Sequence, residues 1–205
     1  MKKLTVILMM LILTAGMVFA SSTVTLNSEV AAGTGATRPG DNSDIIGGGD
    51  EQGFWLTVSY YTDNQINNLK KVSGASENAR LTGNESVTGL IDSLTFVVNY
   101  SGNVRESGSV ASIKFETTGW TGTVGAANAN QTVGINLAYN RVISNLPDGL
   151  MASDIGTDGT FSVSYPAGRI ADTKTVATIA ATWPKSDNLI AGDYQATITV
   201  TVNGN

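Results

Sequence analysis

The C-terminal segment of the chain alternates strictly between apolar and polar residues. Every second residue from Tyr194 to Val202 is apolar, and the residues between them are glutamine or threonine. In a β-strand successive side chains point to opposite faces, whereas an amphipathic helix needs apolar residues three or four positions apart. The segment therefore predicts a strand with one face in a hydrophobic core and the other face toward solvent.

Seven further segments alternate in the same way and are rich in valine, threonine, isoleucine and aromatic residues, which favour strands. They span residues 23–30, 54–61, 94–100, 111–116, 133–139, 161–165 and 177–183. Turn sequences separate them, including Pro147-Asp148-Gly149 and Asp158-Gly159. We predict an all-β fold: an immunoglobulin-like antiparallel two-sheet sandwich of seven or eight strands. A closed barrel is the alternative architecture.

Two stretches lack this alternation. Residues 31–53 are rich in glycine, aspartate and serine, a composition typical of a flexible linker or a long loop. Residues 62–85 are polar and rich in asparagine, and contain only a weak pattern for one or two helical turns at Ile66, Leu69 and Val72. We predict no strand in either stretch.

The N-terminus has the three parts of an export signal. Lys2 and Lys3 precede a nearly continuous apolar run over residues 4–13, and Val18-Phe19-Ala20 provides a cleavage site with small residues. We predict a signal helix that is removed after Ala20; an uncleaved membrane anchor is the alternative. The predicted organisation is a signal peptide (1–20), an N-terminal strand (21–30), a glycine-rich linker or loop (31–53) and a β-sandwich domain (54–205).

Composition excludes several classes of function. The chain has no cysteine and no histidine, which rules out the usual zinc sites, disulfides and Ser-His-Asp or Cys-His catalysis. Loss of Lys2 and Lys3 leaves 10 basic and 17 acidic residues, a net charge of −7 that does not attract nucleic acid. We expect an exported bacterial protein of the periplasm, the cell surface or the extracellular space, which meets a membrane only during export.

The last predicted strand implies that the sandwich is incomplete. Gly192-Asp193-Tyr194 resembles the tyrosine corner of immunoglobulin-like sandwiches, which opens their sixth strand. A seventh strand should follow, but the sequence ends at Asn205. We therefore predict an open edge that accepts a strand from a neighbouring subunit. The donor is the 21–30 segment, with Val24 and Leu26 as its core residues, and the acceptor residues are Tyr194, Ile198, Val200 and Val202.

A family resemblance agrees with this interpretation. The ending Ala191-Gly192-Asp193-Tyr194-Gln195-Ala196-Thr197-Ile198-Thr199-Val200-Thr201-Val202 is similar to the C-terminal strand of bacterial fimbrial subunits, especially the spore-coat-U/Csu-type pilins of chaperone–usher systems. The resemblance covers this strand and the order of signal peptide followed by strand. It implies assembly into a pilus by strand exchange, with sibling subunits or copies of the chain and a periplasmic chaperone as partners.

The predicted function is therefore that of a secreted structural or adhesive surface protein without enzymatic activity, cofactor or metal. The alternative is a monomeric secreted carbohydrate-binding module, in which Trp120, between Gly119 and Thr121 where we expect a loop, stacks on a surface glycan. Packing in the core is the competing interpretation of Trp120, and it is the one we favour. The acidic residues at positions 41, 44, 50 and 51 have no calcium-loop spacing, and we predict that they form a solvated acidic loop.

Overall fold

The computed structural model describes residues 19–30, 44–49, 54–63, 65, 67–83, 88–104, 107–123 and 131–203. All regular elements in these ranges are β-strands, and they form two sheets. The predicted all-β sandwich is confirmed at this level. The described ranges contain no helix long and apolar enough to span a membrane.

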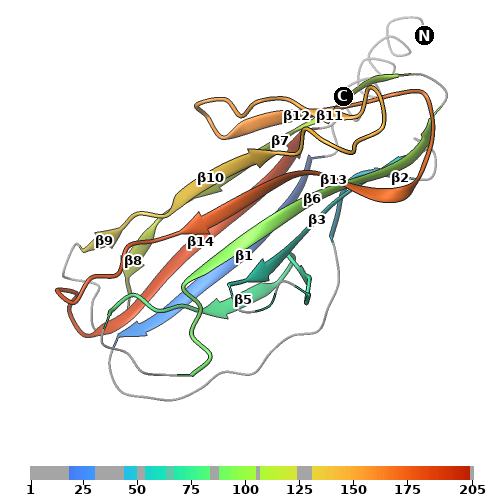
Figure 1. The fold of residues 1–205 in the computed structure, drawn as a ribbon. Helices are drawn as coiled ribbons and strands as arrows, with labels where there is room; N and C mark the ends of the chain where they lie inside the picture. Colours follow the sequence, from blue (N-terminus) through green and yellow to red (C-terminus); the bar gives the residue numbers. More distant parts are fainter. Residues whose placement is uncertain are drawn as a thin grey trace, which may run out of the picture.

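The larger sheet, which we call sheet A, has eight strands. Six of them follow the order β11-β12-β7-β14-β1-β5, while β8 pairs with β14 and with β9. Their bounds are β1 (Phe19–Val30), β5 (Ala75–Asn78), β7 (Gly108–Thr117), β8 (Trp120–Gly122), β9 (Thr132–Val133), β11 (Met151–Ala152), β12 (Thr160–Tyr165) and β14 (Gly192–Asn203). In Figure 1 the blue β1 runs beside the red β14, so the two ends of the described chain share one sheet.

The second sheet, sheet B, has six strands. Its order is β10-β13-β6-β3-β2, with β4 paired to β3. The bounds are β2 (Asp44–Gly49), β3 (Phe54–Thr62), β4 (Lys70–Lys71), β6 (Ser93–Val104), β10 (Asn136–Arg141) and β13 (Gly168–Thr182). Its two longest strands, β6 and β13, pair antiparallel along most of their length.

The hydrophobic core lies between the two sheets, where the apolar faces of the alternating strands meet. Phe96 of sheet B contacts Phe115 of sheet A edge-on with ring centroids 5.2 Å apart, and Phe115 stacks on Phe161 at 6.3 Å. All three side chains are buried. The period-two pattern predicted this burial because alternate residues of a strand share one face.

All eight segments predicted as strands contain strands, with the 133–139 segment divided between β9 and β10. The Asp158-Gly159 turn is also confirmed, since Gly159 has a φ of 81°. A Cβ at this position would lie 2.5 Å from the carbonyl oxygen of Phe115, so only glycine fits.

Two predictions about the segments between strands are wrong. Residues 44–49, assigned to a linker or loop, form β2 and pair with β3. Within residues 62–85, where we expected no strand and a trace of helix, the chain forms β4 and β5. In both regions the strands form through pairing with another strand, β2 and β4 with β3 and β5 with β1, which the alternation within a segment does not report. Residues 1–18 of the predicted signal peptide lie outside the described ranges, whereas Phe19 and Ala20 pair with Asn203 and Val202 at the start of β1.

Candidate functional site

The candidate site is the position that β1 occupies beside β14. The two strands pair antiparallel over twelve residues, from Phe19 opposite Asn203 to Val30 opposite Gly192. Within this pair Val24 lies opposite Ile198, and Leu26 lies opposite Ala196. Both β1 side chains are fully buried. The segment predicted to donate a strand thus contacts the strand predicted to accept one, and does so within a single chain.

This arrangement corrects the prediction of an open edge. β14 pairs with β1 on one side and with β7 on the other, so Tyr194, Ile198, Val200 and Val202 belong to an interior strand and are buried. The sequence ends after β14, but the N-terminal segment completes the sheet. Sequence reasoning missed this possibility because it treated the 21–30 segment only as a donor to another molecule.

Tyr194 fixes the entrance of β14. Its hydroxyl lies 3.0 Å from the carbonyl oxygen of Ile190, four residues upstream, and 2.9 Å from Oε1 of Gln131. The same Oε1 accepts a hydrogen bond from the Ile190 N–H at 2.7 Å, and Nε2 of Gln131 donates to the Asn188 carbonyl at 3.0 Å. A return bond from a strand-opening tyrosine to the upstream backbone is the geometry of a tyrosine corner. This network sets the direction in which β14 enters the sheet.

Trp120 does not occupy the exposed position on which the carbohydrate interpretation depended. It begins β8, where it pairs with Val133, and it is fully buried. Its ring meets that of Trp183 edge-on, with centroids 5.5 Å apart. The indole Nε1 of Trp183 donates to the carbonyl oxygen of Arg80 at 2.9 Å. The interpretation of Trp120 as an exposed loop residue is therefore wrong, and the competing interpretation, packing in the core, is confirmed.

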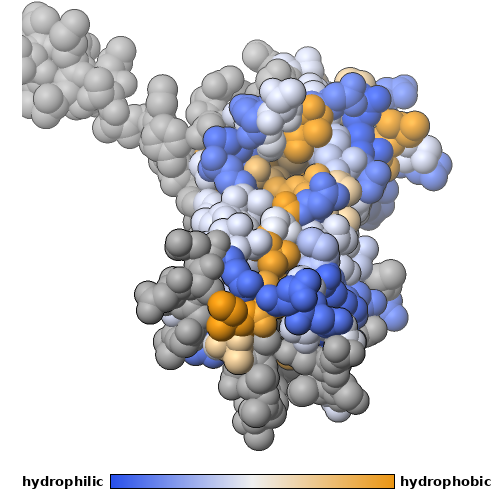
Figure 2. All heavy atoms as spheres, turned by 90° about the vertical axis from the view of Figure 1, so that its left-hand side faces the viewer, coloured by the Kyte–Doolittle hydropathy of each residue, from blue (hydrophilic) through white to orange (hydrophobic). Residues whose placement is uncertain are grey.

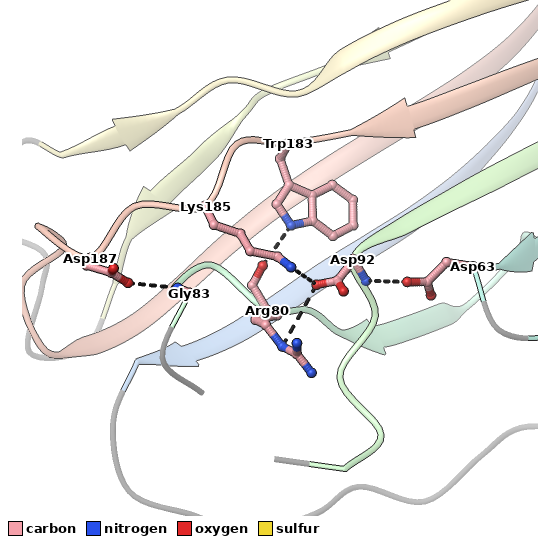
Figure 3. A network of polar contacts seen from close by, with 7 residues as sticks. All are labelled: Asp63, Arg80, Gly83, Asp92, Trp183, Lys185 and Asp187. Carbon is pink, nitrogen blue, oxygen red and sulfur yellow. Dashed lines mark hydrogen bonds and ion pairs between the residues drawn. The ribbon is translucent and has the colours of Figure 1, made fainter. Parts of the chain in front are cut away.

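A polar network ties the loop after β13 to the chain between β5 and β6 (Figure 3). The Asp92 carboxylate forms an ion pair with Nζ of Lys185 at 2.9 Å, and the Asp92 backbone N–H donates to the Asp63 carboxylate at 3.0 Å. Asp187 accepts the Gly83 N–H at 2.7 Å. The contact of Asp187 with Gly83 and that of Trp183 with Arg80 join segments about a hundred residues apart in sequence.

The residues described here offer little for metal or acid–base chemistry. Among them there is no group of three or more acidic side chains placed to hold a metal ion. Of the acidic positions discussed above, 41, 50 and 51 lie outside the described residues, and Asp44 is described only through its backbone in β2. The predicted solvated acidic loop is thus replaced by a strand at Asp44 and stays a prediction for the other three.

The described surface has small apolar groups and a shallow hollow. Figure 2 shows several separate apolar groups among hydrophilic residues on the face that it presents. The large apolar side chains with the greatest exposure among the described residues are Ile143, Met151 and Ile190. A cavity of about 320 Å³ opens beside β9 and the loop after β13, lined by residues that include Gln131, Val133 and Leu189. Since Gln131 already holds the tyrosine corner, this cavity is part of the network around Tyr194.

Comparisons with protein-family models, with curated proteins and with solved structures found no match. The function is therefore argued from the fold and from the β1 position alone.

Proposed function

We propose that the protein is an exported structural subunit of a bacterial surface fibre, which assembles when the β1 segment of one copy takes the β1 position of the next. The partners are other copies of the chain or sibling subunits, and a periplasmic chaperone that protects the strand position before assembly. The supporting observation is the long β1–β14 pair, in which the fully buried Val24 and Leu26 come from the opposite end of the sequence.

The order of strands supports an immunoglobulin-like sandwich as part of this proposal. In that fold one sheet has the order A-B-E-D and the other contains C-F-G. In sheet B, β3, β6, β13 and β10 lie side by side and correspond to A-B-E-D. In sheet A, β7, β14 and β1 lie side by side and correspond to C-F-G. Under this assignment β3, β6, β7, β10, β13 and β14 correspond to strands A, B, C, D, E and F, and they follow one another along the chain in that order. The G strand alone departs from it, because the N-terminal β1 fills the place of a segment that would follow β14.

With the predicted cleavage after Ala20, β1 begins the mature chain, and a strand in that position is suited to exchange. Residues 31–43 connect β1 to β2, and their sequence is rich in glycine and other small residues. The segment 21–30 of a second mature molecule makes the same residue pairs with β14 as residues 21–30 of the chain's own strand do. Such a contact is head-to-tail, and unless it closes into a ring it propagates as a fibre.

The carbohydrate alternative has lost its main support, since Trp120 is buried. We therefore retain a single proposed function.

The test is whether the mature chain, residues 21–205, polymerises. Size-exclusion chromatography with light scattering measures the size of the oligomers, and electron microscopy shows their form. We expect linear oligomers that grow on incubation at high concentration or with mild denaturant, which helps β1 to leave. A chain lacking residues 21–30 should stay free of such oligomers, because it has no strand to donate, and should bind an added peptide of residues 21–30.

The matched control is Leu26→Asp in that peptide, which places a charge at a fully buried position and should abolish binding. A peptide with Thr25→Asp, altered at the half-buried position between Val24 and Leu26, should still bind. A mature chain that stays monomeric under all these conditions, with a melting temperature unchanged by deletion of residues 21–30, would show that the proposal is wrong.

A further inference from the structure

β1 has a second neighbour in sheet A besides β14. Residues Val24–Asn27 pair in parallel with Ala75–Asn78 of β5. The same four residues of β1 pair with β14 on the other side. The middle of β1 therefore has a strand on both edges, and it cannot leave the sheet unless β5 moves away or its pairing is broken.

An ion pair on β5 ties this part of sheet A to sheet B. The carboxylate of Glu77 accepts a hydrogen bond from the Tyr60 hydroxyl at 2.7 Å and forms an ion pair with the Lys70 ammonium. In the β1–β5 register Glu77 is the partner of Leu26. The side chains of Lys70 and Glu77 are only 6% and 11% exposed, and Tyr60 is fully buried. A buried charge pair of this kind is costly to break from one side.

Tyr60 and Lys70 belong to sheet B. Tyr60 lies on β3 and pairs directly with Lys70 of β4, whose ammonium also lies 5.8 Å from the centroid of the Tyr60 ring. The Glu77 carboxylate thus reaches from β5, beside β1, to two side chains of the opposite sheet. As long as these contacts persist, β5 is held against the edge of β1.

The chain beyond β5 is fastened a second time. The Trp183 indole donates to the Arg80 carbonyl at 2.9 Å, and the Ser186 N–H donates to the Leu81 carbonyl at 2.8 Å. Asp187 accepts the Gly83 N–H, as Figure 3 shows. We call residues 70–83 the strap. Its middle, β5, pairs with β1, its first residues pair with β3, and its last residues bond to the loop after β13.

We propose that the strap holds β1 in place, that its opening is the step that releases β1, and that Glu77 is the positioning residue that keeps it closed. This inference rests on the proposed function, because release of β1 is what exchange between copies requires. An incoming β1 occupies the same position, so the strap must open to admit it and close again over it. The strap thus regulates both departure of the chain's own strand and capture of the strand of a second copy.

The test is native-state hydrogen exchange of the mature chain, residues 21–205, read by mass spectrometry. The variants are Glu77→Gln, which removes the charge, and Tyr60→Phe, which removes one hydroxyl and keeps the ring. We expect amides of residues 24–27 to exchange about tenfold faster or more in both, as loss of a hydrogen bond to a charged group predicts. Amides of β6 and β13 should keep the wild-type rates.

The control is Glu116→Gln on β7, which removes another ion-paired carboxylate of sheet A, 53% exposed and paired with Lys114. It should leave the exchange of β1 unchanged. Equal acceleration in β1, β6 and β13 would mean that Glu77 only stabilises the whole fold, and would overturn the inference, as would unchanged exchange of β1 in both variants. If Glu77→Gln does not fold, Tyr60→Phe alone decides.

A second measurement separates this inference from the proposed function. A fluorescent peptide of residues 21–30 is added to the wild-type chain and to both variants, and its uptake is followed by polarisation. Faster uptake in the variants supports both proposals. Equal uptake rates would overturn the strap and leave exchange intact. Locally faster hydrogen exchange without any peptide uptake or oligomers would support the strap and overturn exchange as the function.

Discussion

Val24 lies opposite Ile198 across the β1–β14 pair, and both side chains are fully buried although 174 positions separate them in the numbering. The hydrophobic core of the sandwich therefore includes the N-terminal strand, which makes the strand a stabilising element of the single chain. This relationship underlies both the proposed exchange and the first prediction.

Replacing Leu26 with alanine should lower the free energy of unfolding by about 2–5 kcal/mol, the usual cost of truncating a buried leucine. Leu26 is fully buried beside Ala196. Thr25→Ala is the control, since Thr25 is only partly buried, and it should cost less than about 1 kcal/mol. Urea denaturation followed by circular dichroism measures both. Equal small effects would contradict the burial of β1 in the core.

Tyr194→Phe should lower stability by about 1–2 kcal/mol, because it removes the hydroxyl that holds Ile190 and Gln131 while it preserves the buried ring. The loss should be strongly non-additive with Gln131→Ala, since both variants break the same network. A double-mutant cycle in urea measures this coupling. Simple additivity would mean that the corner contributes only through packing of the ring.

Trp120→Ala should lower the free energy of unfolding by about 3–5 kcal/mol, as expected for loss of a fully buried tryptophan. Trp55, which lies only half-buried on β3, is the control, and Trp55→Ala should cost clearly less. Thermal unfolding and the wavelength of tryptophan emission measure the two effects. A Trp120 variant as stable as wild type would indicate that the residue is exposed after all.

Stability should fall at alkaline pH as buried tyrosines ionise. Burial, and to a lesser degree Tyr165, raises the pKa of Tyr100 from its ordinary value of 10.0 to about 12. Between pH 10 and about 12, Tyr100 therefore keeps its proton in the folded state and loses it in the unfolded state. The contribution to stability is complete below pH 10 and is lost as the pH rises to about 12, with a slope of about 1.4 kcal/mol per pH unit for one proton.

Tyr100→Phe should flatten this dependence between pH 10 and 12, because it removes one titrating group. Val98→Ala, on the same strand, is the control: it should lower stability by the same amount at each pH. Urea titrations at several pH values measure both. An unchanged slope in Tyr100→Phe would show that other groups cause the alkaline loss.

The β4–β5 region shows where sequence reasoning ended. Ala75, Glu77, Ala79 and Leu81 do alternate, and three of them are buried apolar residues. Because residues 62–85 are polar and rich in asparagine as a whole, we predicted no strand there. Only the tertiary structure provides Tyr60 and Lys70, which satisfy the carboxylate and make its burial tolerable.

Trp120 and β2 illustrate the same limit. The glycine before Trp120 indicated a loop, but Val133 provides the pairing that makes a short strand and Trp183 covers the ring. Residues 44–49 have the composition of a linker and become a strand because β3 presents an edge to them. Composition describes what a segment favours in isolation, and pairing with the edge of another strand overrides it.

The sequence by itself determined the eight alternating segments that form strands and which face of each is buried, because side-chain alternation along a strand is a local property. It also determined the tyrosine at the entrance of the last strand. Only the tertiary structure decided that the N-terminal strand completes the sheet beside β14 and that β5 covers its other edge. Strand pairing joins backbone groups that are distant in sequence, so the choice of partner depends on which edges the folded sheets leave open.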